Sequence, residues 1–194
     1  MLRPATDTDV QRMLQWRNQP ANREVSNNQH VIGLDEHLAW WERAKTNDSR
    51  RDLIFEYDGR ALGVVNFFDI DLEAPEKSAE WGFYLDNETT TAEGIAMLAW
   101  QRVMKEAISY AFDELQLDVL NAEVLARNEA VRLTNRRFRF VEGEPAPRTV
   151  GGRTFEVIPI SLRRENRRKS RSDSPPSESA TSESAASQAA KEAK

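Results

Sequence analysis

The chain has 194 residues, with 27 lysines and arginines, 32 aspartates and glutamates, two histidines and no cysteine, and its formal net charge is −5. Without cysteine it can form no disulfide framework, no thiol nucleophile and no Cys-based zinc site, and two histidines offer little to a metal centre. This length corresponds to one globular domain with an extension, and we expect no metal cofactor.

The hydropathy of the chain favours a location in the cytoplasm. No uninterrupted apolar run approaches the roughly 20 residues that a bilayer-spanning helix needs. The N-terminal segment MLRPATDTD lacks the hydrophobic stretch of a signal peptide. We therefore expect a soluble cytoplasmic protein with no membrane partner.

The charge is divided unevenly along the chain. Residues 163–171 hold six basic residues and one acid, residues 172–194 are rich in Ser and Ala, and residues 1–162 keep a net charge of −8. A segment with no residue more apolar than Ala cannot offset its ordering entropy. We predict one folded domain over 1–162 and a tail over 163–194 that is basic, then Ser/Ala-rich and disordered. The tail is interpreted as a solubilising extension, although such a basic run also suits nucleic acid or anionic lipid.

The first half of the domain alternates helix and strand signals, beginning with a short strand at Leu2-Arg3. A helix capped from Thr6 to Asp9 should end near Asn18, because Pro20 disfavours helix in the residue before it. The other elements predicted here are a helix capped by Asp35, strands over 52–57 and 60–69 joined by the Asp58-Gly59 turn, and a strand over 79–85.

The second half contains the longest helical pattern, from about Glu93 to Leu115. Its apolar face is formed by Met97, Leu98, Met104, Ile108, Ala111, Phe112 and Leu115. The elements predicted after it are a strand over 119–125, a helix over 129–137, and strands over 138–142 and 155–162. This mixed order predicts an α+β fold in which helices cover a single sheet.

The most suggestive local pattern is the strand over 79–85 that runs through small and polar residues into the long helix. Such an arrangement presents free backbone N–H groups and the positive end of a helix dipole, which suits a phosphate group. Gly94 beside small residues is equally typical of an ordinary helix entrance.

Several segments together resemble the GNAT superfamily of acetyl-coenzyme A-dependent N-acetyltransferases, over about residues 1–162. They are AEWGFYLD (79–86), the loop ending in Gly94-Ile95-Ala96, the long helix, LDVLNAEVLARNEAV (117–131), and a helix that ends in a Phe-x-Phe pair. The resemblance implies a mixed, mostly antiparallel sheet with a V-shaped cofactor cleft between the strands over 79–85 and 119–125. It also implies acetyl transfer to a primary amine by direct attack, through a tetrahedral intermediate and without a metal.

The resemblance also implies the residues that hold acetyl-coenzyme A. They are Phe83, Tyr84, Leu85, Thr91, Ala92, Glu93, Gly94, Ile95, Ala96, Asn128 and Arg132. Gly94 and Ala96 match the small positions of the family's phosphate-binding pattern, while Thr91 stands where Gln or Arg is usual. Backbone donors carry most of the binding in such cradles, so we expect the site to be weakened only in part. For Arg132, an ordinary solvated helix face is the alternative.

Within the superfamily, the chain is most similar to the branch that acetylates UDP-linked 4-amino-4,6-dideoxy sugars on the pseudaminic acid pathway. The similarity lies in WRNQP (16–20), EHLAWW (36–41) and GVVNFFD (63–69). It implies an amino-sugar acceptor contacted by Arg17, His37, Asn66, Phe68 and Glu80. The alternatives are a helix-capping role for Arg17, a packed interface for His37 and a core position for Phe68.

Three residues are predicted to take part in catalysis: Glu123, Asn135 and Tyr84. Glu80 and Glu123 both lie in predicted interior strands and either could accept the proton of the amine; Glu123 matches a glutamate of the sugar-acetylating branch and is favoured. Many family members have a tyrosine that protonates the leaving thiolate where this chain has Asn135, whose amide donates a hydrogen bond only. Tyr84 is an alternative donor, although we expect it mainly to shape the cleft. The last departure is Arg139, which replaces a usual Gly.

Two rival functions remain open at this point. One is acetylation of protein N-termini or of another small-molecule amine, since the WRN and EH segments also occur in such enzymes. The other is a catalytically degraded module that binds acyl-coenzyme A, suggested by the departures from the family pattern. The oligomeric state is also open, with a homodimer as one alternative, and a nucleic-acid partner is not expected.

Overall fold

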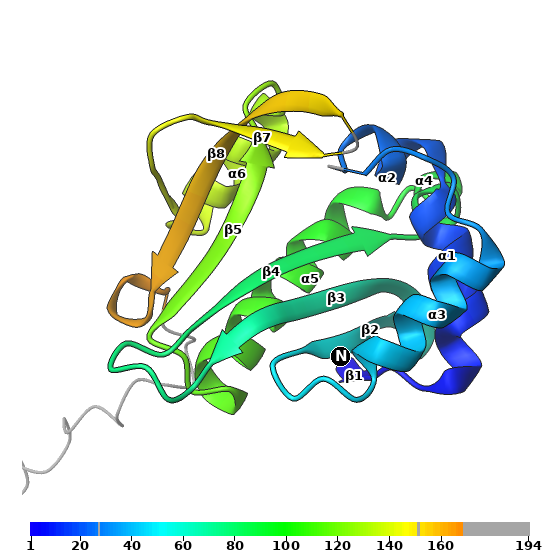
Figure 1. Ribbon diagram of the computed structural model, residues 1–194, viewed down its shortest axis with the longest axis horizontal. Coiled ribbons are helices and arrows are strands. Elements are labelled where there is room, and N and C mark those ends of the chain that lie inside the picture. Colours follow the sequence, from blue (N-terminus) through cyan, green and yellow to red (C-terminus); the bar gives the residue numbers. More distant parts are fainter. Residues whose placement is uncertain (27, 151, 169–194) are drawn as a thin grey trace, which may run out of the picture.

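The computed structural model describes residues 1–26, 28–150 and 152–168, and Figure 1 shows them folded around one central sheet. The strand order is β1-β2-β3-β4-β5-β8-β6, with β7 paired to β8. Every pair is antiparallel except β4 with β5, which is parallel. The predicted α+β fold with a mostly antiparallel sheet is therefore confirmed. The strands are β1 (Leu2–Pro4), β2 (Arg51–Tyr57), β3 (Arg60–Asp71), β4 (Ser78–Leu85), β5 (Val119–Leu125), β6 (Val141–Glu142), β7 (Ala146–Val150) and β8 (Arg153–Arg163).

Six α-helices lie among the described residues. They are α1 (Val10–Asn18), α2 (Pro20–Glu24), α3 (Leu34–Ala44), α4 (Asn87–Ala92), α5 (Ala96–Ser109) and α6 (Glu129–Arg137). A π-helical turn over Tyr110–Glu114 extends α5, and 3-10 turns lie at Asp7–Asp9 and Arg164–Asn166. No helix in the described ranges is both long and apolar enough to cross a membrane.

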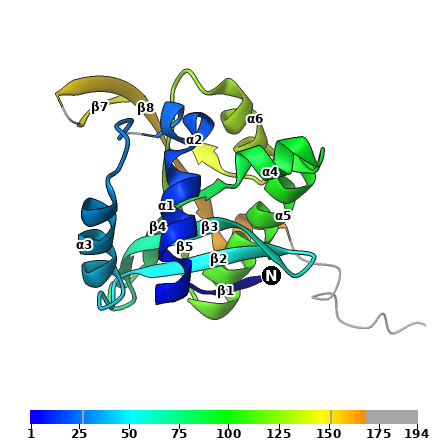
Figure 2. The ribbon, with the colours of Figure 1, turned by 90° about the vertical axis from the view of Figure 1, so that its right-hand side faces the viewer.

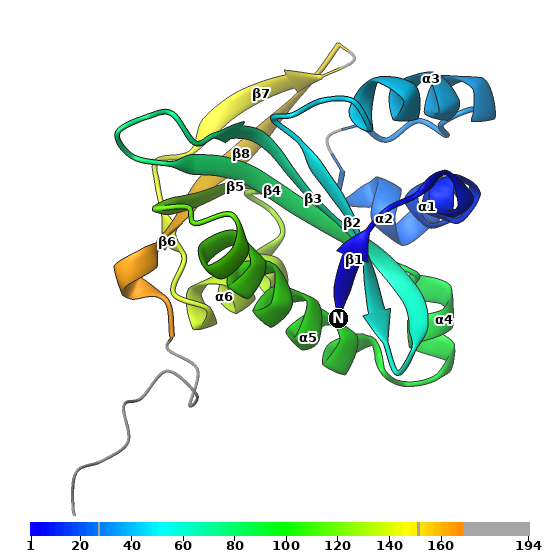
Figure 3. The same cartoon turned by 90° about the horizontal axis from the view of Figure 1, so that it is seen from below.

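Helices cover both faces of the sheet, as Figures 2 and 3 show, with α5 on one face and α1 and α3 on the other. Neighbouring strand residues point to opposite faces. Val65 and Phe67 of β3 pack in the core under α5, whereas Val64 packs in the smaller core under α1 and α3. On β4, Trp81 therefore belongs to the α5 face, and residues 80, 82 and 84 belong to the face of α1 and α3.

The long helix begins at Ala96, three residues later than predicted. The loop before it contains the unpredicted helix α4, which Asp86 caps by accepting a hydrogen bond from the Thr89 amide at 3.1 Å. Gly94 then adopts φ +69°, a left-handed conformation that ends this helical segment. The predicted apolar face was also wrong at its start, because Met97 and Leu98 are 65% and 55% exposed.

Two boundaries in the first half also differ from prediction. Pro20 ends α1 as predicted, but it occupies the first turn of a further helix, α2, where its missing N–H is not needed. The cap of α3 is Gly33, and Asp35 lies inside the first turn, where its charge favours the helix dipole.

The C-terminal part of the fold was the least well predicted. The strand expected over 138–142 shrinks to β6, because the chain leaves α6 through Arg139 at φ +70°. The strand β7, which contains Pro147, was not predicted. The last strand β8 runs to Arg163, one residue past the predicted domain boundary at Leu162, and Arg164 donates to the Leu117 carbonyl at 2.9 Å. The predicted tail from residue 169 onward lies outside the described residues.

Candidate active site

The parallel strands β4 and β5 pair only at their start and then diverge. Their register joins Ser78–Glu80 to Val119–Asn121, and β5 stays paired with β8 up to Leu125. The divergence is visible in Figure 1. A cleft of about 390 Å³ lies between the strands. Its walls include Ala21, Asn22, Trp81, Gly82, Phe83, Tyr84, Leu85, Trp100, Glu123, Asn128, Val131 and Asn135. This arrangement gives the V-shaped opening predicted from the sequence.

The α2 helix holds the far end of β4 in place. Buried Asn22 donates from Nδ2 to the carbonyls of Trp16, at 2.7 Å, and Leu85, at 2.8 Å. Asn87 donates to the side-chain oxygen of Asn22 at 2.6 Å. These bonds fix β4 to the helical layer rather than to β5, so the cleft is part of the folded architecture. Asn22 was not predicted, because no local pattern in the sequence indicates a contact across 63 residues.

The wall formed by β4 offers unpaired backbone groups. Beyond Glu80, no described strand pairs with β4 on the side that faces β5, so alternate N–H and C=O groups are available to an amide-containing ligand. The indole Nε1 of Trp81 is also buried without a hydrogen-bond partner among the described residues. Phe83, Tyr84 and Leu85, predicted to contact the cofactor, all line this wall.

Free amides also lie at the start of α5. The amides of Gly94 and Ile95 bond the carbonyls of Thr91 and Thr90, and the first helical bond of α5 is made by Ala99. The amides of Ala96, Met97 and Leu98 therefore have no acceptor within the described structure, as expected for a helix N-terminus. Of the predicted loop residues, Ala96 supplies one of these free amides, and the other two belong to Met97 and Leu98, which follow it.

The acid within this loop is neutralised by an ion pair. Glu93 accepts two hydrogen bonds from Arg60, at 2.7 and 2.6 Å, and these lower the pKa of Glu93. An anion at the α5 N-terminus would therefore not meet an unpaired carboxylate at this position. The predicted cofactor residues from Thr91 to Ala96 all lie outside the cleft lining and form the turn that leads into α5.

The α6 side of the cleft carries two predicted residues. Asn128 caps α6, with its side-chain oxygen accepting from the Val131 amide at 3.3 Å. Asn135 is 5% exposed and faces the cleft, and its side-chain amide has no hydrogen bond to a described residue. The Asn135 amide is therefore available to a ligand in the cleft. Arg132 does not line the cleft and binds Glu142 at 3.0 and 2.9 Å.

The face of the sheet towards α1 and α3 carries a set of polar and aromatic side chains, and we call this surface the acceptor groove. It contains Asn66, Phe68, Glu80 and Tyr84, because these residues alternate with the buried side chains of the α5 face. The strand register places Asn66 opposite Gly82 and Phe68 opposite Glu80. The predicted acceptor residues on β3 and β4 are thus brought together next to the cleft.

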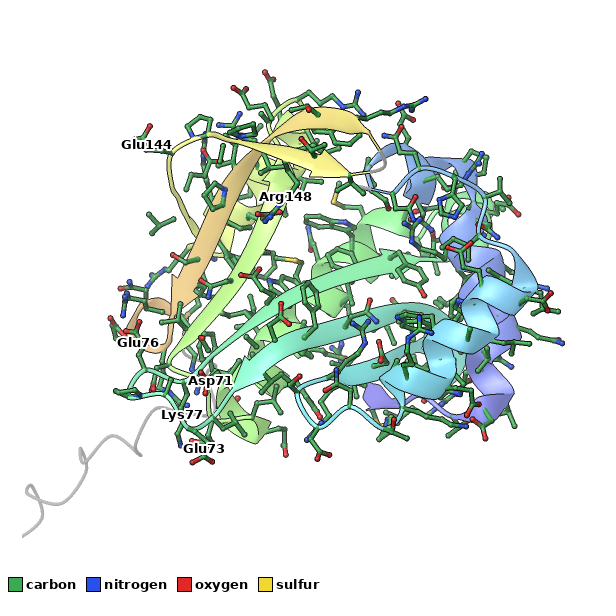
Figure 4. All side chains as sticks on the ribbon, in the orientation of Figure 1. Asp71, Glu73, Glu76, Lys77, Glu144 and Arg148 are labelled. Carbon is green, nitrogen blue, oxygen red and sulfur yellow. The ribbon has the colours of Figure 1, made fainter. Side chains whose placement is uncertain are left out.

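Two carboxylates in the acceptor groove have different surroundings. Glu123 of β5 forms a two-bond ion pair with Arg148, one bond being 3.0 Å long. Figure 4 shows Arg148 extending from β7 toward β5. Glu80 forms no ion pair with a described residue, and burial raises its pKa, an effect increased by the charges of Glu123 and Asp69. Glu80 therefore binds a proton more readily than an ordinary glutamate.

A second cluster in the acceptor groove was missed by sequence reasoning. The Arg50 guanidinium lies 5.2 Å from the ring centre of Trp40 and 5.8 Å from that of Phe68. Asp52 holds Arg50 at 2.8 and 2.9 Å and also accepts a hydrogen bond from Asn66. Phe68 thus takes part in a cation–π stack rather than in the main core. No local sequence pattern indicates Arg50 and Asp52 as site residues, because their partners Trp40, Asn66 and Phe68 come close only when the sheet is assembled.

Arg17 and His37, both predicted to contact the acceptor, differ in their surroundings. Arg17 donates from Nη2 to the Asn28 carbonyl at 2.8 Å, while its Nη1 is buried and unpartnered within the described residues. His37 is 4% exposed, bonds the Val10 carbonyl at 3.0 Å and stacks on Trp40. Burial lowers the pKa of His37. The structure therefore favours the packed-interface alternative for His37.

Tyr84 lies where the acceptor groove meets the cleft. Its side chain packs against the small core under α1 and α3 and also lines the cleft. Burial raises the pKa of the Tyr84 phenol, although the nearby Arg17 acts in the opposite direction. The phenol consequently stays protonated near neutral pH and can donate a hydrogen bond.

The fold and the cleft can be compared with those of known protein families. A family model described as an acetyltransferase (GNAT) domain matches residues 1–141. The chain belongs to this family and is an N-acetyltransferase of the GNAT type, as the sequence resemblance implied.

Among curated proteins, the chain is similar to two from Campylobacter jejuni, both named Acetyltransferase PseH. Identity is 26% with the protein of strain 81-176 and 27% with that of strain NCTC 11168, each over 120 residues. The matched region covers 62% of this chain and 69% of each relative.

Among solved structures, the chain is similar to spermidine N-acetyltransferase from Vibrio cholerae in complex with CoA and spermine. The TM-score is 0.73 at 17% identity, over 86% of this chain and 96% of that one. The crystal structure of PseH from Campylobacter jejuni gives a TM-score of 0.59 at 17% identity, over 84% and 97% of the two chains. At these identities the structures support the fold alone.

The described residues fit coenzyme A. The family uses acetyl-coenzyme A, whose pantetheine amides suit the free edge of β4 and whose pyrophosphate suits the free amides of α5. Within the described ranges, no group of three or more His, Asp or Glu side chains could hold a metal ion.

Proposed function

We propose that this N-acetyltransferase acetylates the primary amine of a nucleotide-linked amino sugar. The observation that carries the proposal is the cleft between β4 and β5, whose lining combines the free edge of β4 with Tyr84 and Glu123 of the acceptor groove. The curated relatives named Acetyltransferase PseH support it. The resemblance of the sequence to the branch that acetylates UDP-linked amino sugars supports it as well. A cytoplasmic location stays a prediction.

On the donor side, backbone groups do most of the binding in this proposal. The edge of β4 pairs with the amide groups of the pantetheine arm, and the amides of Ala96 to Leu98 bind the pyrophosphate. Acetyl-coenzyme A supplies the thioester whose carbonyl carbon the amine attacks. Asn135 donates a hydrogen bond to the sulfur as the carbon–sulfur bond breaks. Asn128 keeps α6 in the position that this contact needs.

On the acceptor side, we assign the general base to Glu80. The amine attacks the thioester only in its neutral form, because the ammonium has no free lone pair. The proton of the ammonium must therefore pass to a carboxylate or a water. Glu80 has a raised pKa and no ion-pair partner in the described structure, whereas Arg148 holds Glu123. Glu123 then increases the proton affinity of Glu80 and anchors β7 over the acceptor groove.

The groove also bears on the identity of the acceptor. Trp40 and Phe68 provide aromatic surface around Arg50, and the guanidinium of Arg17 has a nitrogen available. Aromatic and cationic groups suit a nucleotide better than they suit a polyamine. The rival acceptors are polyamines, peptide N-termini and other small amines.

An acceptor panel tests the proposal. Thiol release from acetyl-coenzyme A is measured with a UDP-4-amino-4,6-dideoxy sugar, spermidine and a peptide with a free N-terminus. We expect the highest kcat/KM for the nucleotide sugar, with mass spectrometry showing one added acetyl group. Turnover of spermidine or peptide without turnover of the sugar contradicts the proposed acceptor. Binding of acetyl-coenzyme A with no turnover of any acceptor would support a degraded module instead.

A further inference from the structure

Trp81 carries a buried hydrogen-bond donor that no described residue satisfies. Its side chain is 5% exposed, and the indole Nε1 has no hydrogen-bond partner in the described part of the chain. The indole stacks on the rings of Phe67, Phe83 and Phe140, with ring centres 5.7–6.4 Å apart, and phenylalanine rings carry no oxygen or nitrogen acceptor. A buried donor without an acceptor is costly. Because Trp81 also lines the cleft, a ligand bound there can supply the acceptor.

Asn135 brings a second donor to the same part of the cleft. Its carbonyl accepts hydrogen bonds from the amides of Phe138 and Phe140, both at 3.0 Å, where the chain turns out of α6. The ring of Phe140 in turn stacks on that of Trp81, with ring centres 6.0 Å apart. Asn135 and Trp81 both line the cleft, and no hydrogen bond joins the Asn135 side-chain amide to a described residue. Phe140 thus holds the two donors beside each other.

The position of Trp81 along β4 indicates which part of the coenzyme these donors meet. The last register pair of β4 and β5 is Glu80 with Asn121, so Trp81 is the first residue at the narrow end of the cleft. The free amides of α5 follow β4 at the opposite, wide end, beyond Leu85. A coenzyme whose pyrophosphate binds these amides, and whose pantetheine arm pairs with the β4 edge, directs its sulfur toward the narrow end.

We propose that Trp81 is a further catalytic residue of acetyl transfer, whose indole N–H donates, together with the Asn135 amide, to the coenzyme sulfur as it leaves. The inference rests on the placement of the coenzyme given under the proposed function and does not depend on which amine is the acceptor. Two N–H donors then take the place of the tyrosine hydroxyl that many family members have at the position of Asn135.

The transfer step requires no proton from either donor. The amine nitrogen forms its bond to the thioester carbonyl carbon, the carbon–sulfur bond breaks, and the electron pair of that bond stays on the sulfur. Trp81 and Asn135 keep their protons, because an indole and an amide are donors that do not ionise near neutral pH. Their hydrogen bonds stabilise the thiolate, which afterwards takes a proton from water.

The first test measures the thiol of bound coenzyme A and needs no acceptor. Ultraviolet difference titration of the complex gives the pKa of this thiol, which two N–H donors should hold below the value for free coenzyme A. Trp81→Phe keeps an aromatic ring and removes the N–H, and should raise the pKa of the bound thiol by about one unit, as expected for one charge-assisted hydrogen bond. Asn135→Asp places a negative charge beside the sulfur and should raise it further.

Trp41→Phe is the matched control. Trp41 is 4% exposed, lies outside the cleft lining and donates from its indole to Asp7 at 2.7 Å. The control should leave the thiol pKa unchanged and kcat within about twofold, whereas Trp81→Phe should lower kcat about tenfold. In thermal unfolding the order should reverse: Trp41→Phe loses a hydrogen bond of the folded protein, and Trp81→Phe removes a donor without a described partner.

The indole N–H can also be observed directly in the unmodified protein. The chain has five tryptophans, whose indole N–H resonances can be followed by nuclear magnetic resonance. Coenzyme A should shift the Trp81 resonance downfield, and desulfo-coenzyme A, which lacks the sulfur, should not. This measurement decides the question if Trp81→Phe does not fold.

Two results would overturn the proposal. They are a thiol pKa in Trp81→Phe equal to that in Trp41→Phe, and an equal shift of the Trp81 resonance by coenzyme A and by desulfo-coenzyme A. If Trp81 lowers the thiol pKa but no UDP-amino sugar is acetylated, the sulfur site stands and the proposed acceptor fails. If the sugar is acetylated and Trp81→Phe changes neither the thiol pKa nor kcat, the proposed function stands and Trp81 is a structural residue.

Discussion

Glu80 and Glu123 illustrate how two carboxylates on neighbouring strands acquire different chemistry. Both face the acceptor groove, but Glu123 is bound by Arg148, and Glu80 has no such partner among the described residues. Burial and the charge of Glu123 raise the pKa of Glu80. A single-residue exchange should therefore separate the two roles.

Glu80→Gln should lower kcat about 100-fold, since general-base catalysis contributes roughly 10²–10⁴ to a rate. The KM for acetyl-coenzyme A should stay close to the unmodified value, because Glu80 lies on the acceptor face. A loss of kcat in Glu123→Gln that exceeds the loss in Glu80→Gln would assign the base to Glu123, as the sequence favoured. Stopped-flow measurement of thiol release supplies both constants.

The dependence of kcat on pH follows from the same pair. Because the pKa of Glu80 is raised, kcat should fall on acidification at a higher pH than for an ordinary glutamate. Glu123→Gln removes the negative charge and releases Arg148, and both changes lower the pKa of Glu80. The acidic limb of kcat should then move to lower pH, and a shift to higher pH would contradict the assignment.

Asp9 provides a test of stability at the residue scale. Arg3 donates to both of its oxygens, at 2.8 and 2.9 Å, and lowers the Asp9 pKa from 3.8 to about 2. The ionised form stabilises the fold fully above the unfolded pKa, and this stabilisation is lost as the pH falls toward 2. Asp9→Asn should lower the free energy of unfolding by about 2 kcal/mol at neutral pH.

Urea denaturation at several pH values measures this difference. The gap between Asp9→Asn and the unmodified protein should close as the pH approaches 2. Asp48→Asn, at an exposed position, is the control and should change stability by less than about 0.5 kcal/mol. A gap that does not vary with pH would show that the ion pair with Arg3 is not its source.

At the scale of elements, the entrance to α5 decides how the donor binds. Gly94 at φ +69° ends the segment of α4 and leaves three amides free at the start of the next helix. Gly94→Ala should cost about 1 kcal/mol of stability, because a β-carbon disfavours this conformation, and should weaken coenzyme A binding by displacing the amides. Gly152→Ala, at φ +75° in the β7–β8 connection, is the matched control.

The control should share the loss of stability and keep the affinity for coenzyme A. Isothermal titration and urea denaturation of both variants separate the two effects. Equal affinity of Gly94→Ala and the unmodified protein would show that the turn does not orient the phosphate-binding amides.

The sequence predicted the long elements well and the short ones poorly. The strands β2 to β5 and the helix α6 follow clear apolar periodicity or turn signals, and they appear close to their predicted bounds. The helices α2 and α4 have five and six residues, too few for a periodic pattern, and they depend on Pro20 and on the Asp86 cap. The strand β7 is mostly exposed and is held by its pairing with β8, which the sequence does not reveal.

The dependence of sequence prediction on local patterns also explains which site residues could be predicted. Asn135, Glu80 and Glu123 were recognisable as polar residues within otherwise apolar elements or by their family positions, and the structure brings them to the cleft or the acceptor groove. Asn22 and Arg50 act through contacts between distant segments, so no local pattern indicated them. Their roles become visible only when the sheet is assembled.

For the whole molecule, the sign of the net charge does not favour the ligands that we propose. Residues 1–162 carry a net charge of −8, yet both proposed ligands are anionic. Free amides at the start of α5 and the guanidinium of Arg17 must therefore act locally, over distances shorter than the screening length of about 8 Å at physiological salt. Salt should accordingly affect binding of the nucleotide-linked acceptor through these contacts rather than through steering by the whole protein.

The central claim is that donor and acceptor meet through the cleft from opposite faces of the sheet. Gly82 lies at that meeting point on β4: it lines the cleft, and a β-carbon added there would find no atom within 4 Å. Residues 80, 82 and 84 share the acceptor face, so a larger side chain would extend into the acceptor groove. Gly82 is in an extended strand, where valine is well tolerated.

The most direct measurement is therefore acetyl transfer and coenzyme A binding in Gly82→Val, with Gly82→Ala as the intermediate step. We predict a loss of about 100-fold in kcat/KM for the acceptor, since small displacements of reacting groups carry such costs, with the affinity for coenzyme A within about twofold of the unmodified value. Undiminished transfer by Gly82→Val, or a parallel loss of coenzyme A binding and transfer, would contradict the two-sided cleft.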